Sequence, residues 1–246
     1  RLRSSGLRVD VGMEAELARV SLAGHLIRTT RGRPQVLVKQ ALSSDLKIAA
    51  AGHRPVAITG PASNAQVQLM RVRADAILIG VGTALADNPS LTCRLPALED
   101  RSPLRVVLDR RLDLSVESVL AQTARTVPVL VFAEETADER RRDALEAFGV
   151  IVRFASDVES ALASLAGDGI QTLLVEAGAR LARALHDADL IDRYEIFRSP
   201  KPIGADGIRA MQGLAVESAL ESSRYALHDT RRHGADIRRT YLRRSI

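Results

Sequence analysis

Short runs of apolar residues alternate along the chain with stretches in which apolar residues recur at every third or fourth position. The first pattern is typical of strands buried in a sheet, and the second is typical of amphipathic helices. The predicted strands cover residues 36–41, 76–79, 104–108, 129–132, 150–154, 172–175 and 194–197. The predicted helices cover residues 64–73, 137–148, 158–165 and 178–187. This alternation indicates an α/β domain with a mostly parallel sheet, and residues 225–230 and 236–243 predict a closing antiparallel hairpin.

Residues 1–33 follow a different pattern. Residues 6–12 alternate like one short strand, and residues 14–27 have the apolar spacing of a helix. Such a segment cannot bury a hydrophobic core by itself. We therefore expect residues 1–33 to be the end of a preceding unit and residues 34–246 to form the main domain.

Composition places the chain among ordinary globular proteins. Of its 246 residues, 46% are hydrophobic and 26% are charged, which excludes a disordered or collagen-like chain. The longest uncharged apolar stretches, such as residues 76–85, are far shorter than the roughly 20 residues of a membrane helix. No basic and then apolar leader opens the sequence, so we expect a soluble, cytoplasmic protein. A single cysteine, Cys93, excludes an internal disulfide and agrees with a reducing compartment.

The charge balance points to small anionic ligands. The net charge is +5, and because only Lys39, Lys47 and Lys201 are lysines, nearly all of the excess is arginine scattered along the chain. There is no Trp and only 3% aromatic residues, so no basic stripe carries the aromatic side chains on which bases stack. An RNA-binding module is therefore a minor alternative. Scattered arginines fit phosphorylated small molecules better.

Two predicted strands end in glycine turns that lead into helices. One turn is Gly80-Val81-Gly82-Thr83, and the other is Glu176-Ala177-Gly178-Ala179-Arg180. Glycine allows close approach of the backbone, and the N-terminus of a following helix attracts anions. Ligands bind at such carboxyl ends in open parallel sheets. Each turn alone could be a plain connection, but two in one α/β domain favour a phosphate site.

Several charged residues lie where a ligand at this edge would meet them. Glu176 directly follows an apolar strand, although it could equally be the N-cap of the next helix. Lys39 lies inside an apolar strand and Asp45 in the turn after it. Arg71 could instead stabilise the C-terminus of its own helix. Arg94 lies in a loop and is free to meet a phosphate.

Other chemistries find little support in the sequence. The five histidines show no pair at metal-ligand spacing, so we expect no metal site. No serine lies in a nucleophile elbow. Cys93 lies beside Arg94, but an unpaired cysteine is usually inert packing.

A longer series of motifs resembles one family. The series comprises Lys39, Ser43-x-Asp45, Ile58-Thr59-Gly60-Pro61, Arg71, the block from Asp75 to Thr83, Ala86-Asp87-Asn88-Pro89-Ser90-Leu91-Thr92 and Arg94. Arg105-Val106-Val107-Leu108-Asp109, Leu174-Val175-Glu176-Ala177-Gly178 and Ser199-Pro200-Lys201-Pro202-Ile203-Gly204 continue it. Together they resemble the reductase domain of bifunctional riboflavin-biosynthesis proteins over about residues 33–243, most specifically in residues 80–94. In that family a zinc deaminase precedes the reductase, and its signature is absent from this chain, so no deaminase activity is expected.

The resemblance implies a dihydrofolate-reductase-like fold, a homodimer, and NADPH-dependent reduction of 5-amino-6-(5-phosphoribosylamino)uracil to its ribitylamino product. Hydride would pass from the nicotinamide to C1 of the opened ribose. The family pattern assigns substrate binding to Arg71, Leu91, Arg94 and Glu176. It assigns cofactor binding to Thr59, Gly80, Gly82, Thr83, Asp87, Gly178, Ala179, Arg180 and Leu181. We assign catalytic roles to Lys39, Asp45 and Glu176, with Lys39 or Asp45 assisting ring opening or proton delivery.

Three positions depart from the family pattern. Leu46 replaces a glycine after Asp45, Ala57 replaces an aromatic residue, and Arg110 replaces a small hydroxyl residue. We expect the first to distort its turn, since glycine often supplies a positive φ there, and the second to weaken cofactor binding. The alternative function is therefore a weakly active or inactive relative that binds a nucleotide or pathway metabolite as a regulator or subunit.

Overall fold

A nine-stranded sheet forms the centre of the computed structural model, which describes residues 1–54 and 56–244. The strand order is β10-β11-β8-β1-β7-β3-β4-β5-β6, parallel from β8 to β6 and antiparallel where β11 and β10 extend one edge. A separate antiparallel ladder joins β2 and β9. The bounds are β1 (Gln35–Leu42), β2 (Lys47–Ala49), β3 (Ala76–Gly80), β4 (Leu104–Leu108), β5 (Val129–Ala133), β6 (Ile151–Phe154), β7 (Thr172–Glu176), β8 (Arg193–Arg198), β9 (Ile208–Arg209), β10 (Tyr225–His233) and β11 (Asp236–Arg243).

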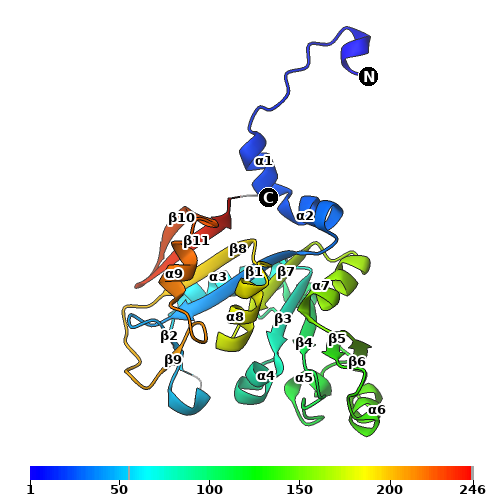
Figure 1. The fold of residues 1–246 in the computed structure, drawn as a ribbon, viewed down its shortest axis with the longest axis vertical. Coiled ribbons are helices and arrows are strands. Elements are labelled where there is room, and N and C mark those ends of the chain that lie inside the picture. Colours follow the sequence, from blue (N-terminus) through cyan, green and yellow to red (C-terminus); the bar gives the residue numbers. More distant parts are fainter. Residues whose placement is uncertain (55, 245–246) are drawn as a thin grey trace.

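Helices cover both faces of the sheet (Figure 1). One buried apolar cluster includes side chains of α7 (Val158–Gly167), α8 (Ala179–Asp187) and α9 (Val216–Leu220). The other includes side chains of α3 (Pro61–Arg73), α4 (Val81–Asp87), α5 (Val119–Gln122) and α6 (Glu139–Ala147). In β3, Ala76 and Leu78 belong to the first cluster, whereas Ile77 and Ile79 belong to the second. Burial on both faces explains why the central strands are continuous apolar runs in the sequence.

The predicted α/β class, the parallel strands and the C-terminal hairpin are confirmed, and apart from the end of β10 the strand boundaries agree with the prediction or differ from it by one residue. The hairpin loop is shorter than expected, because residues 231–233 continue β10 and the turn is Gly234-Ala235. Gly234 has a φ of 64°, which glycine adopts without strain. The short elements β2, β9, α5 and α9 were not predicted.

The expectation for the N-terminal segment was wrong in two respects. Residues 7–12 form no strand, since a lone strand needs a neighbour with which to pair its backbone groups. The predicted helix over residues 14–27 is divided into α1 (Ala15–Ser21) and α2 (Ala23–Arg31) at Leu22, whose φ of −98° and ψ of 8° are not helical. Helix α2 packs against the body through Ala23 and Ile27, while α1 buries no residue.

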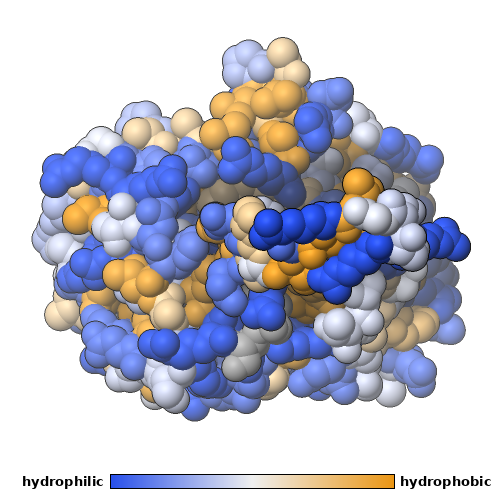
Figure 2. Space-filling model, turned by 90° about the horizontal axis from the view of Figure 1, so that it is seen from above, coloured by the Kyte–Doolittle hydropathy of each residue, from blue (hydrophilic) through white to orange (hydrophobic). Residues whose placement is uncertain are grey.

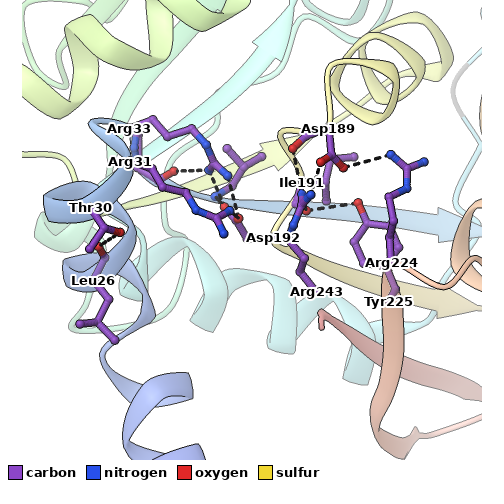
Figure 3. A network of polar contacts seen from close by, with 12 residues as sticks. Leu26, Thr30, Arg31, Arg33, Asp189, Ile191, Asp192, Arg224, Tyr225 and Arg243 are labelled. Atoms are coloured by element: carbon purple, nitrogen blue, oxygen red, sulfur yellow. Dashed lines mark hydrogen bonds and ion pairs between the residues drawn. The ribbon is translucent and has the colours of Figure 1, made fainter. Parts of the chain in front are cut away.

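A buried ion pair fixes the connection between α2 and β1 (Figure 3). Asp192 is fully buried and accepts two hydrogen bonds from the Arg33 guanidinium, at 2.6 and 2.8 Å. The same carboxylate accepts the backbone N–H of Val36 at 2.9 Å, and Arg31 lies 3.7 Å away. The segment before the predicted domain boundary at residue 33 is therefore anchored to the sheet through Asp192, a residue 159 positions further along the chain.

The surface carries small, separate apolar patches among hydrophilic side chains when it is viewed from the end where the N-terminal segment projects (Figure 2). Leu2, Leu7, Val11, Met13 and Leu17 are all exposed in that segment. None of the helices in the described part of the chain is long and apolar enough to span a bilayer.

His186, near the end of α8, is buried with a partner at each ring nitrogen. Nδ1 lies 3.2 Å from the Tyr194 hydroxyl, and the Arg224 guanidinium contacts Nε2. Because a guanidinium only donates, Nε2 accepts, and the ring is neutral with its proton on Nδ1. Burial, reinforced by the positive charge of Arg224, lowers the pKa of His186.

Because the pKa of His186 is lowered, we expect the protein to lose stability in mild acid. Because the pKa of His186 is lowered on folding, its contribution to stability is complete above the ordinary value of 6.5. The contribution is lost as the pH falls below 6.5, since the unfolded chain binds a proton there that the folded chain does not bind. One such group changes the free energy of unfolding by at most about 1.4 kcal/mol per pH unit. Urea unfolding at several pH values below 6.5 should show a flatter pH dependence for His186→Gln than for the parent. Equal slopes would contradict this account of His186.

Candidate active site

Three strands bring the site together at the carboxyl edge of the sheet. Lys39 of β1 and Glu176 of β7 are register partners in neighbouring parallel strands, so their side chains leave the same face. Strand β3 pairs with the other side of β7 and ends at Gly80. Lys39 and the two glycine turns therefore lie on three adjacent strands, β1, β7 and β3.

Glu176 is the centre of a charge cluster. Its Oε1 accepts hydrogen bonds from Nε and Nη2 of Arg71, at 3.0 and 2.8 Å. Its Oε2 lies 4.0 Å from Nζ of Lys39. The remaining arm of Arg71 donates to the carbonyl of Thr92 at 2.9 Å. The side chain of Glu176 is 19% exposed, so the carboxylate can still meet a ligand.

These contacts test two interpretations that the sequence left open: Glu176 as a helix N-cap, and Arg71 as a residue that only stabilises the end of its own helix. Helix α8 begins after Gly178 with no side-chain cap, so the N-cap interpretation of Glu176 is wrong. Arg71 reaches out to Glu176 and Thr92, and so it does more than end its helix. Burial opposes ionisation of Glu176, but the charges of Lys39 and Arg71 and the hydrogen bonds from Arg71 outweigh it and lower the pKa. The carboxylate is ionised at neutral pH and can accept hydrogen bonds.

Arg94 presents a free positive charge beside this cluster. Its backbone N–H donates to Gln68 at 2.8 Å, which fixes the residue, while its side chain is exposed. The guanidinium has no ion-pair partner among the described residues, and its charge helps to lower the pKa of Glu176. Leu91, in contrast, points its side chain into the core and is 2% exposed. Leu91 as a whole is therefore shielded from solvent, and this structure gives no support for a substrate contact from it.

The two glycine turns approach each other closely. A Cβ built on Gly178 would lie 3.2 Å from Oγ1 of Thr83, tighter than ordinary contact, so a larger residue at this position would require the Thr83 side chain to shift. Gly80 precedes α4, and Gly82 lies inside its first turn with open space where a side chain would be. Ala179, Arg180 and Leu181 form the first turn of α8, whose N-terminus no side chain caps. Its free N–H groups can receive an anion.

Asp87, at the end of α4, is a second carboxylate, and its pKa is shifted in the opposite direction to that of Glu176. Burial and the negative charge of Glu176 raise its pKa. Its proximity to Glu176 places the end of α4 beside the charge cluster. Two neighbouring carboxyl groups whose pKa values move apart are typical of functional sites.

Asp45 anchors two loops. Its carboxylate accepts the Ser43 hydroxyl at 2.5 Å and the N–H groups of Ile203 and Gly204 at 3.0 and 2.8 Å. These hydrogen bonds, that of Ser43 first, hold the pKa of Asp45 well below its usual range. A carboxylate that is always ionised and fully engaged is poorly suited to deliver a proton. Leu46 adopts a φ of 63°, the left-handed conformation that glycine adopts without strain, so this turn is formed at a conformational cost to the leucine.

Thr59 lies apart from the cluster. It precedes α3, whose first residue, Pro61, lies ten residues before Arg71, about 15 Å along a helix that rises 1.5 Å per residue. Its hydroxyl donates to Asn64 at 3.4 Å. Ala57 is exposed, and Arg110 is exposed and paired with Glu134.

Two buried polar residues that hold the loop at residues 88–94 were assigned no role from the sequence. Gln68 lies three residues before Arg71 on the same face of α3, a spacing that could have pointed to it. Arg105 lies inside the apolar strand β4, as Lys39 does in β1, and it donates to the carbonyl of Ser90 at 3.1 Å.

The chain is similar to known proteins over most of its length. The family model described as RibD C-terminal domain matches residues 34–237. The riboflavin biosynthesis protein RibD of Chlamydia trachomatis is 33% identical over 222 residues, which cover 88% of this chain and 59% of that protein. RibD of Actinobacillus pleuropneumoniae is 30% identical, over 98% of this chain and 65% of that protein. The chain thus spans about three fifths of the length of these relatives.

Solved structures give the same result. Acinetobacter baumannii RibD superposes with a TM-score of 0.82 at 29% identity, over 98% of this chain and 67% of that one. A Thermotoga maritima protein described as a diaminohydroxyphosphoribosylaminopyrimidine deaminase and 5-amino-6-(5-phosphoribosylamino)uracil reductase gives 0.81 at 28% identity, over 98% and 65%. A Saccharomyces riboflavin biosynthesis reductase, 19% identical, shares the fold with a TM-score of 0.65 over 92% and 99%. These structures share the α/β fold of this chain, with its mostly parallel sheet and antiparallel C-terminal strands.

Proposed function

The chain belongs to the RibD C-terminal domain family, and we propose that it reduces 5-amino-6-(5-phosphoribosylamino)uracil to the ribitylamino compound with NADPH. The observation that carries the proposal is the ionised Glu176 between Arg71 and Lys39, beside two glycine turns. In this arrangement Glu176 is the hydrogen-bond acceptor and the two glycine turns are the anion sites, and all three lie at one edge of the sheet.

The residues present fit a dinucleotide cofactor. The close approach of Gly178 to Thr83 and the uncapped start of α8 leave backbone N–H groups for a pyrophosphate. Thr83, Asp87 and the first turn of α8, which comprises Ala179, Arg180 and Leu181, would hold NADPH. When bound, the cofactor supplies the hydride that reduces C1 of the opened ribose.

The protein's own groups hold and protonate the substrate. Arg94 binds the phosphate through charge-assisted hydrogen bonds, because its guanidinium is exposed and unpaired among the described residues. Glu176 accepts a hydrogen bond from an N–H group of the aminouracil. Lys39 carries the proton that the ribose ring oxygen takes up when the ring opens, since its ammonium group lies against Glu176. Positioning two ligands in this way is the main demand of a hydride transfer.

The proposal is tested by mixing the protein with NADPH and the aminouracil phosphate and following the absorbance of reduced nicotinamide. We expect NADPH to be oxidised only when the aminouracil phosphate is also present. If both ligands bind and no oxidation follows, the chain is a regulator or subunit, and the proposed activity is wrong. If neither ligand binds, the site assignment itself is wrong.

Arg94→Ala is expected to weaken substrate binding by roughly 10- to 150-fold, because one charge-assisted contact to a phosphate contributes about 1.5–3 kcal/mol. NADPH binding and the melting temperature should stay near those of the parent, since the side chain is exposed and unpaired in the described chain. Calorimetric titration measures both affinities. Arg73→Ala, a change of another exposed arginine, is the matched control and should alter neither affinity.

We further propose a homodimer in the cytoplasm. Strand β10 is an edge of the sheet, and Leu227 and Ile237 on the hairpin are 56% and 37% exposed. An edge strand with exposed apolar residues is suited to pair with another chain. Light scattering during gel filtration should give twice the monomer mass, and a monomer mass would contradict the proposal.

A further inference from the structure

Arg105 is a fully buried arginine in strand β4. Its Nη1 donates to the carbonyl of Ser90 at 3.1 Å and to Oγ1 of Thr123 at 2.8 Å. Its Nη2 donates to the carbonyls of Thr123, at 3.1 Å, and Val127. No carboxylate lies within ion-pair distance in the described part of the chain. The guanidinium is therefore surrounded by neutral oxygen atoms.

Such a residue is unfavourable for stability alone. A buried cation without a carboxylate partner is costly, and the Nε atom of Arg105 has no acceptor. The register partners of Arg105 on the two sides are Ile77 and Val129, so the row is otherwise apolar. Burial lowers the pKa of Arg105 to about 10, which leaves it protonated at neutral pH. An apolar residue would suit this position better unless the guanidinium has another task.

The loop that Arg105 holds has a strained backbone. Leu91 has a φ of 56°, a left-handed conformation that is unfavourable for a leucine. The carbonyl before it, that of Ser90, accepts from Arg105, and the carbonyl after it, that of Thr92, accepts from Arg71. Two buried guanidinium groups thus hold the backbone on both sides of the strained residue.

The same loop carries Arg94. Beyond Thr92, the N–H of Cys93 donates to Ser102 at 3.0 Å and the N–H of Arg94 donates to Gln68 at 2.8 Å. Movement of the backbone at Leu91 would shift Arg94 relative to Glu176. Strain that surrounding groups hold in place is typical of functional loops.

We propose that Arg105 is a positioning residue, which keeps Leu91 in its left-handed conformation through the carbonyl of Ser90 and thereby aims Arg94 at the phosphate of the substrate. Arg105 itself touches no ligand. The inference rests on the proposed function for the identity of the phosphate ligand, but the loop geometry is independent of it.

Arg105→Met tests the proposal, because it keeps an unbranched side chain and removes every donor. We expect the KM for the aminouracil phosphate to rise about tenfold or more, while kcat and the Kd for NADPH change by less than about threefold. In the free protein, amide hydrogen exchange at Cys93 and Arg94 should become faster. Arg105→Lys retains a charge and a donor and should recover part of the KM, and it replaces the Met variant if that variant does not fold.

Arg33→Met is the matched control. Arg33 is also a buried arginine, but it contacts Asp192 far from the loop, so its loss should lower stability without changing the KM or the exchange at Cys93 and Arg94. A parent-like KM and parent-like exchange in the Arg105 variants would overturn the proposal while leaving the proposed function intact. If the parent shows no turnover, the proposed function fails, and the exchange data alone decide whether Arg105 holds the loop.

Discussion

Glu176→Gln is expected to lower kcat/KM about 100-fold, because an uncharged amide replaces the carboxylate that holds Arg71 and accepts from the substrate. The change also leaves Arg71 and Lys39 without a carboxylate in a mostly buried site. Breaking a buried ion pair costs roughly 3–5 kcal/mol, and the partial exposure of Glu176 places the loss at the lower end of that range. Steady-state kinetics and thermal unfolding of the same preparations measure the two effects.

Acid should remove the stability difference between the parent and this variant. The pKa of Glu176 is below its ordinary value, so its stabilising effect is complete above pH 4.5 and is lost as the pH falls through the lowered pKa. Glu176→Asp keeps the charge but moves it, and should therefore lose efficiency with a smaller loss of stability. Parental kinetics in the Asp variant would contradict a substrate contact from this carboxylate.

Asp192→Asn is expected to cause the largest loss of stability, about 3–5 kcal/mol, without a direct effect on the site. Asp192 is 0% exposed, and it neutralises Arg33 and accepts the N–H of Val36. The amide leaves the Arg33 guanidinium buried and uncompensated. At about 2–4 °C per kcal/mol for a chain of this size, the melting temperature should fall by roughly 6–20 °C.

The exposed pair of Arg8 and Asp10 provides the control for this change. Asp10→Asn should alter the melting temperature little, because exposed pairs contribute about 0–1 kcal/mol. Replacing both buried partners, as Arg33→Met with Asp192→Leu, should recover part of the loss, since no unpaired charge then remains. A melting temperature for Asp192→Asn within about 2 °C of the parent would show that this contact does not fix β1.

The sheet could be predicted from the sequence because its strands are buried on both faces. Residues 104–108 and 129–133 are continuous apolar runs apart from Arg105, and runs of this length are typical of strands covered by helices on both sides. The location of the site at the carboxyl edge could also be predicted, because parallel strands bring their carboxyl ends together at one edge of the sheet. Glu176 and the glycine turns followed from their places after such strands.

The parts that could not be predicted depend on tertiary contacts. The break at Leu22 arises because α2 packs on the sheet and α1 does not, which a helical spacing cannot show. Glu176 could be read from the sequence as a helix N-cap, but its carboxylate instead accepts from Arg71, a residue 105 positions away in the chain. Asp45 looked like a candidate acid in the sequence, yet its oxygens are taken by Ser43 and by backbone of a distant loop. Sequence spacing carries no information on such pairings.

Transfer of deuterium from the cofactor distinguishes a reductase from a protein that only binds both ligands. The protein is incubated with the aminouracil phosphate and NADPH that carries deuterium at C4 of the reduced nicotinamide, prepared separately for each face. We expect a ribitylamino product that is one mass unit heavier, with the label on C1 of the ribityl chain, from one of the two labelled cofactors. A product without label from either cofactor, or no ribitylamino product at all, would contradict it.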